Sequence, residues 1–107
     1  MIHELKTWPE FFDAVDRGEK TFEVRLDDRG FQVGDTLRLQ RFRPGHSSQW
    51  GANRYVDRDD GNHSPYFDEA LNAEIRVLVT YKLPGGRFGI DPAFCVLGFR
   101  KIEGAKP

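Results

Sequence analysis

The residues best suited to chemistry lie close together, in the stretch from Gly18 to Arg25. Apolar and polar residues alternate there with the period of a strand, which puts Thr21, Glu23 and Arg25 on one face with Lys20 at its mouth. A carboxylate in that setting can serve as a general base or accept hydrogen bonds from a nucleobase edge. Lysine and arginine can hold a phosphate or polarise a carbonyl group. The competing interpretation is a solvated strand face with ordinary cross-strand ion pairs.

The opposite face of the same segment carries Phe22 and Val24, and this is the apolar face that a strand needs in order to fold. Four polar residues flank the segment, namely His3 and Lys6 upstream and Asp28 and Arg29 downstream. They would join the same site if the first two strands of the fold are neighbours.

The segment before this stretch predicts a short strand over residues 2–6 followed by a helix. Thr7 and Glu10 have the spacing of a capping box, and Pro9 is tolerated in a first helical turn. Gly18 is the expected stop signal. The apolar stripe expected to face the core consists of Trp8, Phe11, Phe12 and Val15.

The remaining pattern is that of a small β-rich domain. Strands are predicted over residues 20–26, 36–42, 73–81 and 94–102, and residues 103–107 are expected to form a tail. The glycine-rich run at 84–89 sits between two strands and predicts a hairpin turn. With one N-terminal helix and about five to six strands, the fold class is mostly β (α+β), as a closed or nearly closed β-barrel.

Residues 43–72 have no sustained period and predict a long polar insert loop. Aromatic and histidine side chains are interleaved there with arginines: His46, Trp50, Tyr55, His63, Tyr66 and Phe67. Such a mixture can stack bases and contact phosphate, and the alternative is that the aromatics fold back onto the barrel. The acids and histidines lack the spacing of calcium or zinc ligands, so we expect no metal and no cofactor.

Length and charge limit the classes of protein that fit. The 107 residues suit one domain spanning 1–107, with 16 basic and 17 acidic residues and a net charge of −1. That balance excludes a strongly basic coat for nucleic acid, although it leaves room for a local basic patch. A single cysteine, Cys95, cannot form an internal disulfide, and no apolar run is long enough for a membrane span. We therefore expect a cytoplasmic protein.

The motif Gly18-x-Lys20-x-x-Glu23-x-Arg25 resembles the signature of the ASCH superfamily, whose domains are similar in fold to the PUA RNA-binding domain. The likeness extends to His3-x-Leu5-Lys6 before the helix, to Asp28-Arg29-x-Phe31-x-Val33-Gly34-Asp35 after the motif, and to Val96-Leu97-Gly98 near the end. Together these features look like the small bacterial and phage-borne branch called DUF3850. The likeness covers most of the chain outside 43–72.

This resemblance implies a PUA-like barrel with a cleft beside the helix, and binding of RNA or a nucleotide. The implied binding residues are His3, Lys6, Lys20, Thr21, Glu23, Arg25, Asp28 and Arg29. Some relatives are amidohydrolases that remove an acyl group from N4-acetylcytidine with a lysine, a threonine and a glutamate. Lys20 matches their lysine, Glu23 stands where they have threonine, and Glu74 is the candidate for their glutamate. The alternatives are therefore an amidohydrolase with Lys20 and Glu23 as catalytic residues, or a protein-interaction module using the long loop.

Overall fold

A computed structural model describes residues 1–44, 53–59, 61, 63–64, 66–68 and 72–106 of the chain. Within these residues the fold is mostly β, with seven strands and one helix of eight residues, which confirms the predicted fold class. In chain order the elements are β1 (Ile2–Thr7), α1 (Pro9–Asp16), β2 (Phe22–Leu26), β3 (Thr36–Arg43), β4 (Arg54–Val56), β5 (His63–Ser64), β6 (Glu74–Pro84) and β7 (Phe94–Lys106).

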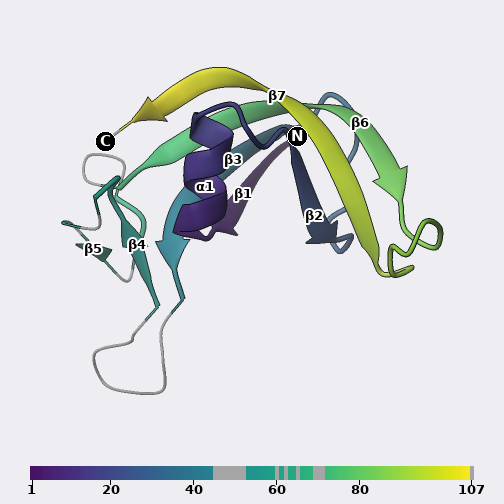
Figure 1. Ribbon diagram of the computed structural model, residues 1–107, viewed down its shortest axis with the longest axis horizontal. Coiled ribbons are helices and arrows are strands. Elements are labelled where there is room, and N and C mark those ends of the chain that lie inside the picture. Colours follow the sequence, from purple (N-terminus) through teal and green to yellow (C-terminus); the bar gives the residue numbers. More distant parts are fainter. Residues whose placement is uncertain (45–52, 60, 62, 65, 69–71, 107) are drawn as a thin grey trace.

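The main sheet has the order β2-β7-β6-β3, with β1 added beside β3. β1 runs parallel to β3, and the other neighbouring strands are antiparallel. The far end of β3 also pairs with β4, and β4 pairs with β5, which makes a small outlying sheet. Figure 1 shows the long strands β6 and β7 arching over the domain, with α1 beneath the arch.

The two edge strands of the main sheet, β1 and β2, are joined by arginine side chains. Arg25 Nη2 donates to the carbonyl oxygen of Lys6 at 2.7 Å, and Arg29 Nη1 donates to that of Glu4 at 2.8 Å. Among the described strands, no backbone pairing joins β1 to β2. The sheet is therefore open at this seam, where we had expected a closed or nearly closed barrel. The opening is what leaves space for a cleft between the two strands.

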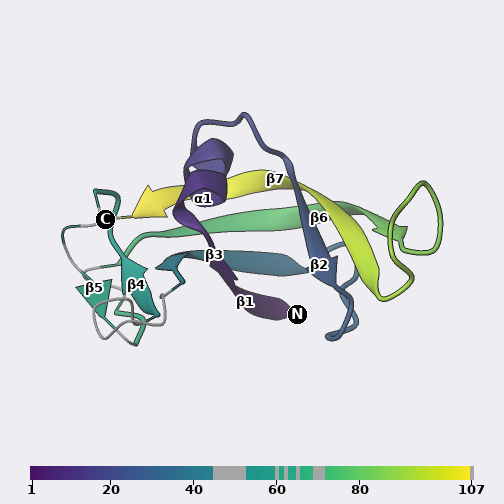
Figure 2. The ribbon, with the colours of Figure 1, turned by 60° about the horizontal axis from the view of Figure 1, so that its bottom comes forward.

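The core fills the inner face of the sheet beneath α1. Its buried members are Leu5, Phe12, Val15, Phe31, Leu37, Leu39, Ala73, Ile75, Val77, Val79, Cys95, Leu97 and Phe99. A buried arginine fixes the helix to the sheet: Arg41 contacts both carboxylate oxygens of Asp13 at 3.0 and 3.1 Å, and donates to the carbonyl of Asp57 at 2.5 Å. Figure 2 shows α1 lying across the sheet at this end. The helix is thus a fixed wall for whatever lies beside it.

The predicted capping box at the start of α1 is wrong. The N-cap residue is Trp8, and it makes no side-chain capping hydrogen bond. Thr7 is instead the last residue of β1, where it is paired with Arg41, and its hydroxyl donates to the Leu5 carbonyl at 3.4 Å. Because the backbone of Thr7 is held in the sheet, its side chain cannot cap the helix. Pro9 does occupy the first helical position, as expected.

The predicted apolar stripe of the helix is only half buried. Phe12 and Val15 are in the core, but Trp8 and Phe11 are 49% and 45% exposed. Gly18 follows the helix with φ of +79°, a left-handed conformation that favours glycine, so the predicted stop signal is confirmed. The helix therefore buries one edge of its stripe and leaves two aromatic rings available at its N-terminal end.

Two other expectations need correction. The segment 43–72 is not simply a loop, because the described part of it contains β4 and β5. Nor do residues 103–107 form a tail: β7 continues to Lys106, and Glu103 and Lys106 pair with β6. The end of β7 pairs with the start of β6, far away in sequence. The β4 and β5 strands are short and polar, and they have no periodic pattern of their own that would reveal them.

Candidate functional site

The strand β2 faces the opposite way from what its apolar residues suggest. Phe22, Val24 and Leu26 are 45–47% exposed, whereas Glu23 is buried at 6%. The register agrees, since Glu23 is paired with Leu97 and Arg25 with Cys95, and both of these partners belong to the core. The polar face of β2 therefore points into the domain.

Glu23 is held between two cations. Lys20 Nζ donates to Glu23 Oε1 at 2.6 Å and to the Phe22 carbonyl at 2.6 Å. On the other side, Arg25 Nε lies 3.3 Å from Glu23 Oε2, within ion-pair distance. The ammonium group also lies 5.0 Å from the Phe22 ring centroid and 5.7 Å from that of Phe11, in the range of a cation–π contact. The buried carboxylate is thus balanced by charge and fixed in position.

Arg25 connects this carboxylate to the strand across the seam. Its Nη2 donates to the Lys6 carbonyl and lies 3.5 Å from the Thr7 hydroxyl. Its Nε is buried and, despite its closeness to Glu23, makes no hydrogen bond among the described residues. The geometry there is that of an ion pair without a well-aligned hydrogen bond.

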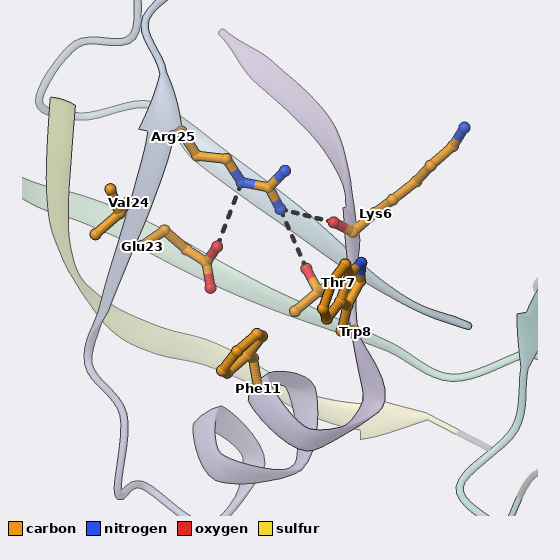
Figure 3. A pocket seen from close by; sticks show the side chains of 7 residues that line it. All are labelled: Lys6, Thr7, Trp8, Phe11, Glu23, Val24 and Arg25. Atoms are coloured by element: carbon orange, nitrogen blue, oxygen red, sulfur yellow. Dashed lines mark hydrogen bonds and ion pairs between the residues drawn. The ribbon is translucent and has the colours of Figure 1, made fainter. Parts of the chain in front are cut away.

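These groups line an open cleft of about 190 Å³ between β1, β2 and the start of α1. The residues around it are Lys6, Thr7, Trp8, Phe11, Glu23, Val24 and Arg25. Figure 3 shows the Glu23 carboxylate facing this space from one side and the rings of Phe11 and Trp8 facing it from others. The two rings are nearly parallel, with centroids 6.1 Å apart and planes inclined by 21°. Charged and aromatic groups therefore meet in one concavity.

Two of the predicted binding residues contribute less directly. Lys6 offers its backbone carbonyl to Arg25, but its side chain extends away from the cleft and its Nζ lies 5.0 Å from the Phe42 ring centroid (Figure 3). Thr21 precedes β2, and it lines a separate hollow beside Gly18. The sequence-based expectation that Thr21 shares the face of Glu23 in one site is therefore not met.

Three further predicted residues lie outside the cleft. His3 is buried 2.9 Å from Asp35, with its ring edge-on to Phe31 at 4.7 Å. Asp28 is exposed, and its carboxylate lies 4.0 Å from Arg29 Nε. Arg29 in turn donates to the Glu4 carbonyl on β1, across the seam. None of these three residues lines the cleft.

Glu74, the candidate for a catalytic glutamate, also lies elsewhere. It is paired with Gln40 on β3 and contacts Arg38 at 2.8 Å. The adjacent pair Leu39 and Ile75 is buried in the core, so Glu74 and Gln40 point to the outer face of the sheet. Glu74 cannot share a site with Glu23, which points to the inner face.

Asp35 forms a second polar centre that anchors the N-terminus. It accepts from His3, from the Gln32 amide at 3.0 Å and from the Met1 ammonium at 3.1 Å. Since an ionised carboxylate can only accept, the His3 Nε2 carries the proton in this contact. Burial by itself would raise the pKa of Asp35, but the hydrogen bonds from His3, Gln32 and the N-terminus together lower it. This centre stabilises β1 rather than forming part of the cleft.

Sequence reasoning missed four cleft residues, Thr7, Trp8, Phe11 and Val24, and it had placed Val24 on the apolar face of the strand. It had assigned Thr7 to a cap and both rings to the core. The exposure of the two rings could have been inferred from Pro9 and from the number of large apolar residues in the stripe. A helix of only eight residues that starts at Pro9 can bury only part of such a stripe. Two large rings at the first turn of so short a helix are then expected at its surface.

The aromatic residues of the 43–72 segment divide into two groups. Tyr55 packs edge-on against Phe42 at 5.2 Å and against Phe67 at 5.6 Å, so these rings fold back onto the sheet. Tyr66 is 79% exposed. His46 and Trp50, and the side chain of His63, lie outside the described part of the chain. In that part, no three histidine, cysteine or acidic side chains converge as metal ligands, and α1 is too short to span a membrane.

The fold and the cleft together define a small β-rich domain with an open seam, in which a polar strand face is turned inward toward a short helix. Residues 2–99 match the model of the family described as "Domain of unknown function (DUF3850)", and the chain belongs to that family. It is also similar to the "Uncharacterized 12.9 kDa protein in GpA 3'region" of Escherichia phage P2, with 44% identity over 41 residues. That match covers 38% of this chain and 38% of the phage protein.

Proposed function

We propose that this chain binds RNA or a nucleotide by taking a base into the cleft between β1, β2 and α1. The observation that carries the proposal is the buried Glu23 carboxylate, which faces an open space that also holds two half-exposed aromatic rings. Burying a charged group is costly, and a strand normally turns its apolar face inward. A carboxylate kept inside an accessible cleft is better suited to a ligand than to folding alone.

The chemistry of the cleft matches that of a nucleobase. Trp8 and Phe11 offer ring faces on which any base can stack, a contact worth about 1–3 kcal/mol. Glu23 can accept from an amino or imino group of the base edge, as glutamate does from cytosine. Arg25 and Lys20, on either side of the carboxylate, can donate to carbonyl oxygens or ring nitrogens. Stacking and edge recognition are therefore available together.

The size of the cleft supports a ligand of one base. Its volume of about 190 Å³ is below the roughly 300–1,000 Å³ typical of sites for drug-sized molecules. A larger ligand would have to extend out of the cleft along the protein surface. This agrees with a base that is presented by a nucleotide or by a single strand, because the sugar and phosphate would remain outside.

The test is binding of a dye-labelled random single-stranded RNA, measured by fluorescence anisotropy. Trp8→Ala should weaken binding about tenfold or more, since it removes a stacking face. Phe88→Ala is the matched control, because Phe88 is an 83% exposed ring on the turn between β6 and β7. Equal losses in the two variants, or no binding by the unmodified protein, would overturn the proposal.

A second candidate function is hydrolysis of an N4-acylated cytidine in the same cleft. Two observations favour it: Lys20 Nζ lies 2.6 Å from Glu23, as in an activated pair, and Thr7 supplies a hydroxyl to the cleft from β1. In this scheme Lys20 activates a nucleophile, Glu23 transfers protons, and water is consumed to release a carboxylate and the free amine. The candidate nucleophile is the Thr7 hydroxyl, in place of the threonine missing at position 23: it takes the acyl group as an ester while the amine leaves with a proton, and water then hydrolyses the ester to the carboxylate and restores the hydroxyl.

This candidate is tested by incubating the protein with N4-acetylcytidine and measuring released cytidine by liquid chromatography. Thr7→Val and Lys20→Met should each abolish release if the scheme is right. Thr7 is also buried at the end of β1, so circular dichroism must show that the Thr7→Val variant is folded. Release at the original rate in the folded variants would eliminate the scheme, and absence of release by the unmodified protein would leave binding as the function.

A further inference from the structure

A second hollow lies beside Lys20. It has a volume of about 410 Å³, and its charged or polar lining comes from both ends of the fold: Asp16, Arg17, Lys20, Thr21, Arg100 and Lys101. The first four follow or end α1, and the last two belong to β7. The hollow is therefore built where the end of the helix meets the long strand.

Lys20 links the two spaces through its bond to Glu23. Its ammonium group bonds to Glu23, which lines the cleft, and lies 5.7 Å from the Phe11 ring centroid on that same side. The Lys20 residue also lines the second hollow. One side chain thus bonds to a residue of the cleft and lines the second hollow.

The acidic groups at the second hollow are already neutralised. The Asp16 carboxylate pairs with Lys101 at 3.2 Å and with Arg58 at 2.9 Å. The nearby Glu19 pairs with Arg17 at 2.9 Å, an interaction that raises the pKa of Arg17 and lowers that of Glu19. With both carboxylates paired to cations, neither of them repels an anion strongly.

The end of the helix does not oppose an anion either. A helix C-terminus carries partial negative charge on its free carbonyls, which would normally disfavour phosphate. Here those carbonyls are occupied: the Ala14 oxygen accepts from the Glu19 and Lys20 amides at 2.9 and 3.1 Å, and the Asp16 oxygen accepts from Lys101 at 2.9 Å. The field at the hollow is therefore set mainly by the cationic side chains.

Arg100 adds a cation that has no counter-charge. Its side chain makes no hydrogen bond or ion pair within the described part of the chain, and the residue is exposed. Cations thus outnumber carboxylates around the hollow, on a protein whose net charge is −1. A local positive excess of this kind attracts a phosphate group.

We infer that the second hollow holds a phosphate of the ligand whose base occupies the cleft, so that the ligand is a nucleotide or a nucleotide within a single strand rather than a free nucleoside. This inference rests on the proposed function. It assigns Lys20 a place at the junction of the two subsites, with Arg100 and Arg17 supplying charge to the phosphate. It also explains why the conspicuous lysine lies beside, and not inside, the aromatic cleft.

The test compares three classes of probe by isothermal titration calorimetry: the four ribonucleosides, their 5′-monophosphates, and a random ten-nucleotide single-stranded RNA. We expect the best monophosphate or the RNA to bind at least about tenfold more tightly than the best nucleoside. A gain with the monophosphate identifies a free nucleotide as sufficient, and a gain with the RNA alone identifies a phosphate on the other side of the sugar. Both outcomes support a phosphate subsite.

Arg100→Gln should remove most of that gain without changing nucleoside affinity. Arg87→Gln is the matched control, because Arg87 is likewise exposed and, in the described residues, makes no hydrogen bond or ion pair. Nucleosides that bind as tightly as monophosphates and RNA, or equal effects of the two arginine variants, would overturn the phosphate subsite and leave the base cleft standing. No binding of any probe would overturn the proposed function together with this inference.

Discussion

Glu23 is a costly residue to bury, and in the proposed function it would supply specificity for a base. Its side chain is only 7% exposed, so its charge is tolerated because Lys20 and Arg25 lie on either side. Those two partners are themselves mostly covered, at 18% and 25% exposure. A carboxylate balanced in this way keeps a fixed orientation, which is a condition for reading the edge of a base with hydrogen bonds.

Replacing this charge should be measurable in the stability of the fold. Glu23→Gln leaves two cations facing a neutral amide, and we expect the free energy of unfolding to fall by about 1–3 kcal/mol. Urea denaturation gives the value. Glu19→Gln is the control, because the Arg17–Glu19 pair has a similar contact distance of 2.9 Å but is largely exposed. That variant should unfold at the midpoint of the unmodified protein, and matching losses in the two would refute a special role for burial.

Asp35 should control the acid limb of stability. Its pKa in the folded protein is lowered, so the folded state binds fewer protons than the unfolded state near the ordinary carboxyl value of 3.8. The stabilisation is therefore fully present above that value and is lost as the pH falls through the lower folded pKa. Urea unfolding between about pH 2 and 6 should show this loss below about pH 4. The Asp35→Asn variant should be less stable at pH 6, and its free energy of unfolding should depend less on pH below pH 4. An unchanged dependence on pH in that range would contradict the assignment.

At the scale of elements, the sequence identified the important strand but not its orientation. The spacing of Lys20, Glu23 and Arg25 was enough to find the strand, since alternation is a local property. Which face points inward depends on what the rest of the fold places there. The inner side of β2 is an open seam rather than a packed core, so the charged side chains fit it and Phe22 and Val24 remain at the surface.

The turn between β6 and β7 is set by a close approach that sequence alone cannot reveal. A Cβ atom on Gly85 would overlap the carbonyl oxygens of Asp91 and Phe94. Gly85→Ala should therefore destabilise the protein by about 1–3 kcal/mol, as overpacking does. Gly98→Ala is the control on the adjacent strand, because its Cβ would meet Tyr81 at an ordinary 3.5 Å. Thermal unfolding of both variants checks this, and a similar melting temperature in the two would count against the close approach.

At the scale of the whole molecule, the elements with strong local signals were predictable and the long-range pairings were not. The helix stop at Gly18 and most of the strands are visible as patterns of a few residues. The extension of β7 to Lys106 depends on partners at the start of β6, far away in sequence, and the short β4–β5 pair lies in a polar segment that has no alternating pattern. The cleft could not be predicted for the same reason. It forms because Thr7 and Trp8 lie opposite Glu23 across the seam, and the spacing of residues along the sequence does not indicate that arrangement.

The charge of the whole molecule limits how nucleic acid can bind. A net charge of −1 provides no general attraction, so we expect binding to depend on the few cations at the two proposed subsites, chiefly Lys20 and Arg100. If about two or three phosphates are neutralised, the logarithm of the affinity for single-stranded RNA should fall with the logarithm of salt concentration with a slope of about −1.5 to −2. A basic coat contacting 6–10 phosphates would instead give roughly −4 to −7.

Anisotropy titrations of a labelled ten-nucleotide RNA between about 50 and 300 mM potassium chloride measure this slope. Arg100→Gln should make it shallower by about 0.7, the contribution of one phosphate contact on a single strand, whereas Arg87→Gln should leave it unchanged. A slope steeper than about −4 would point to binding over a broad surface outside the cleft. A slope near zero would mean that the base alone is held, because a phosphate in the second hollow must displace counterions when it binds.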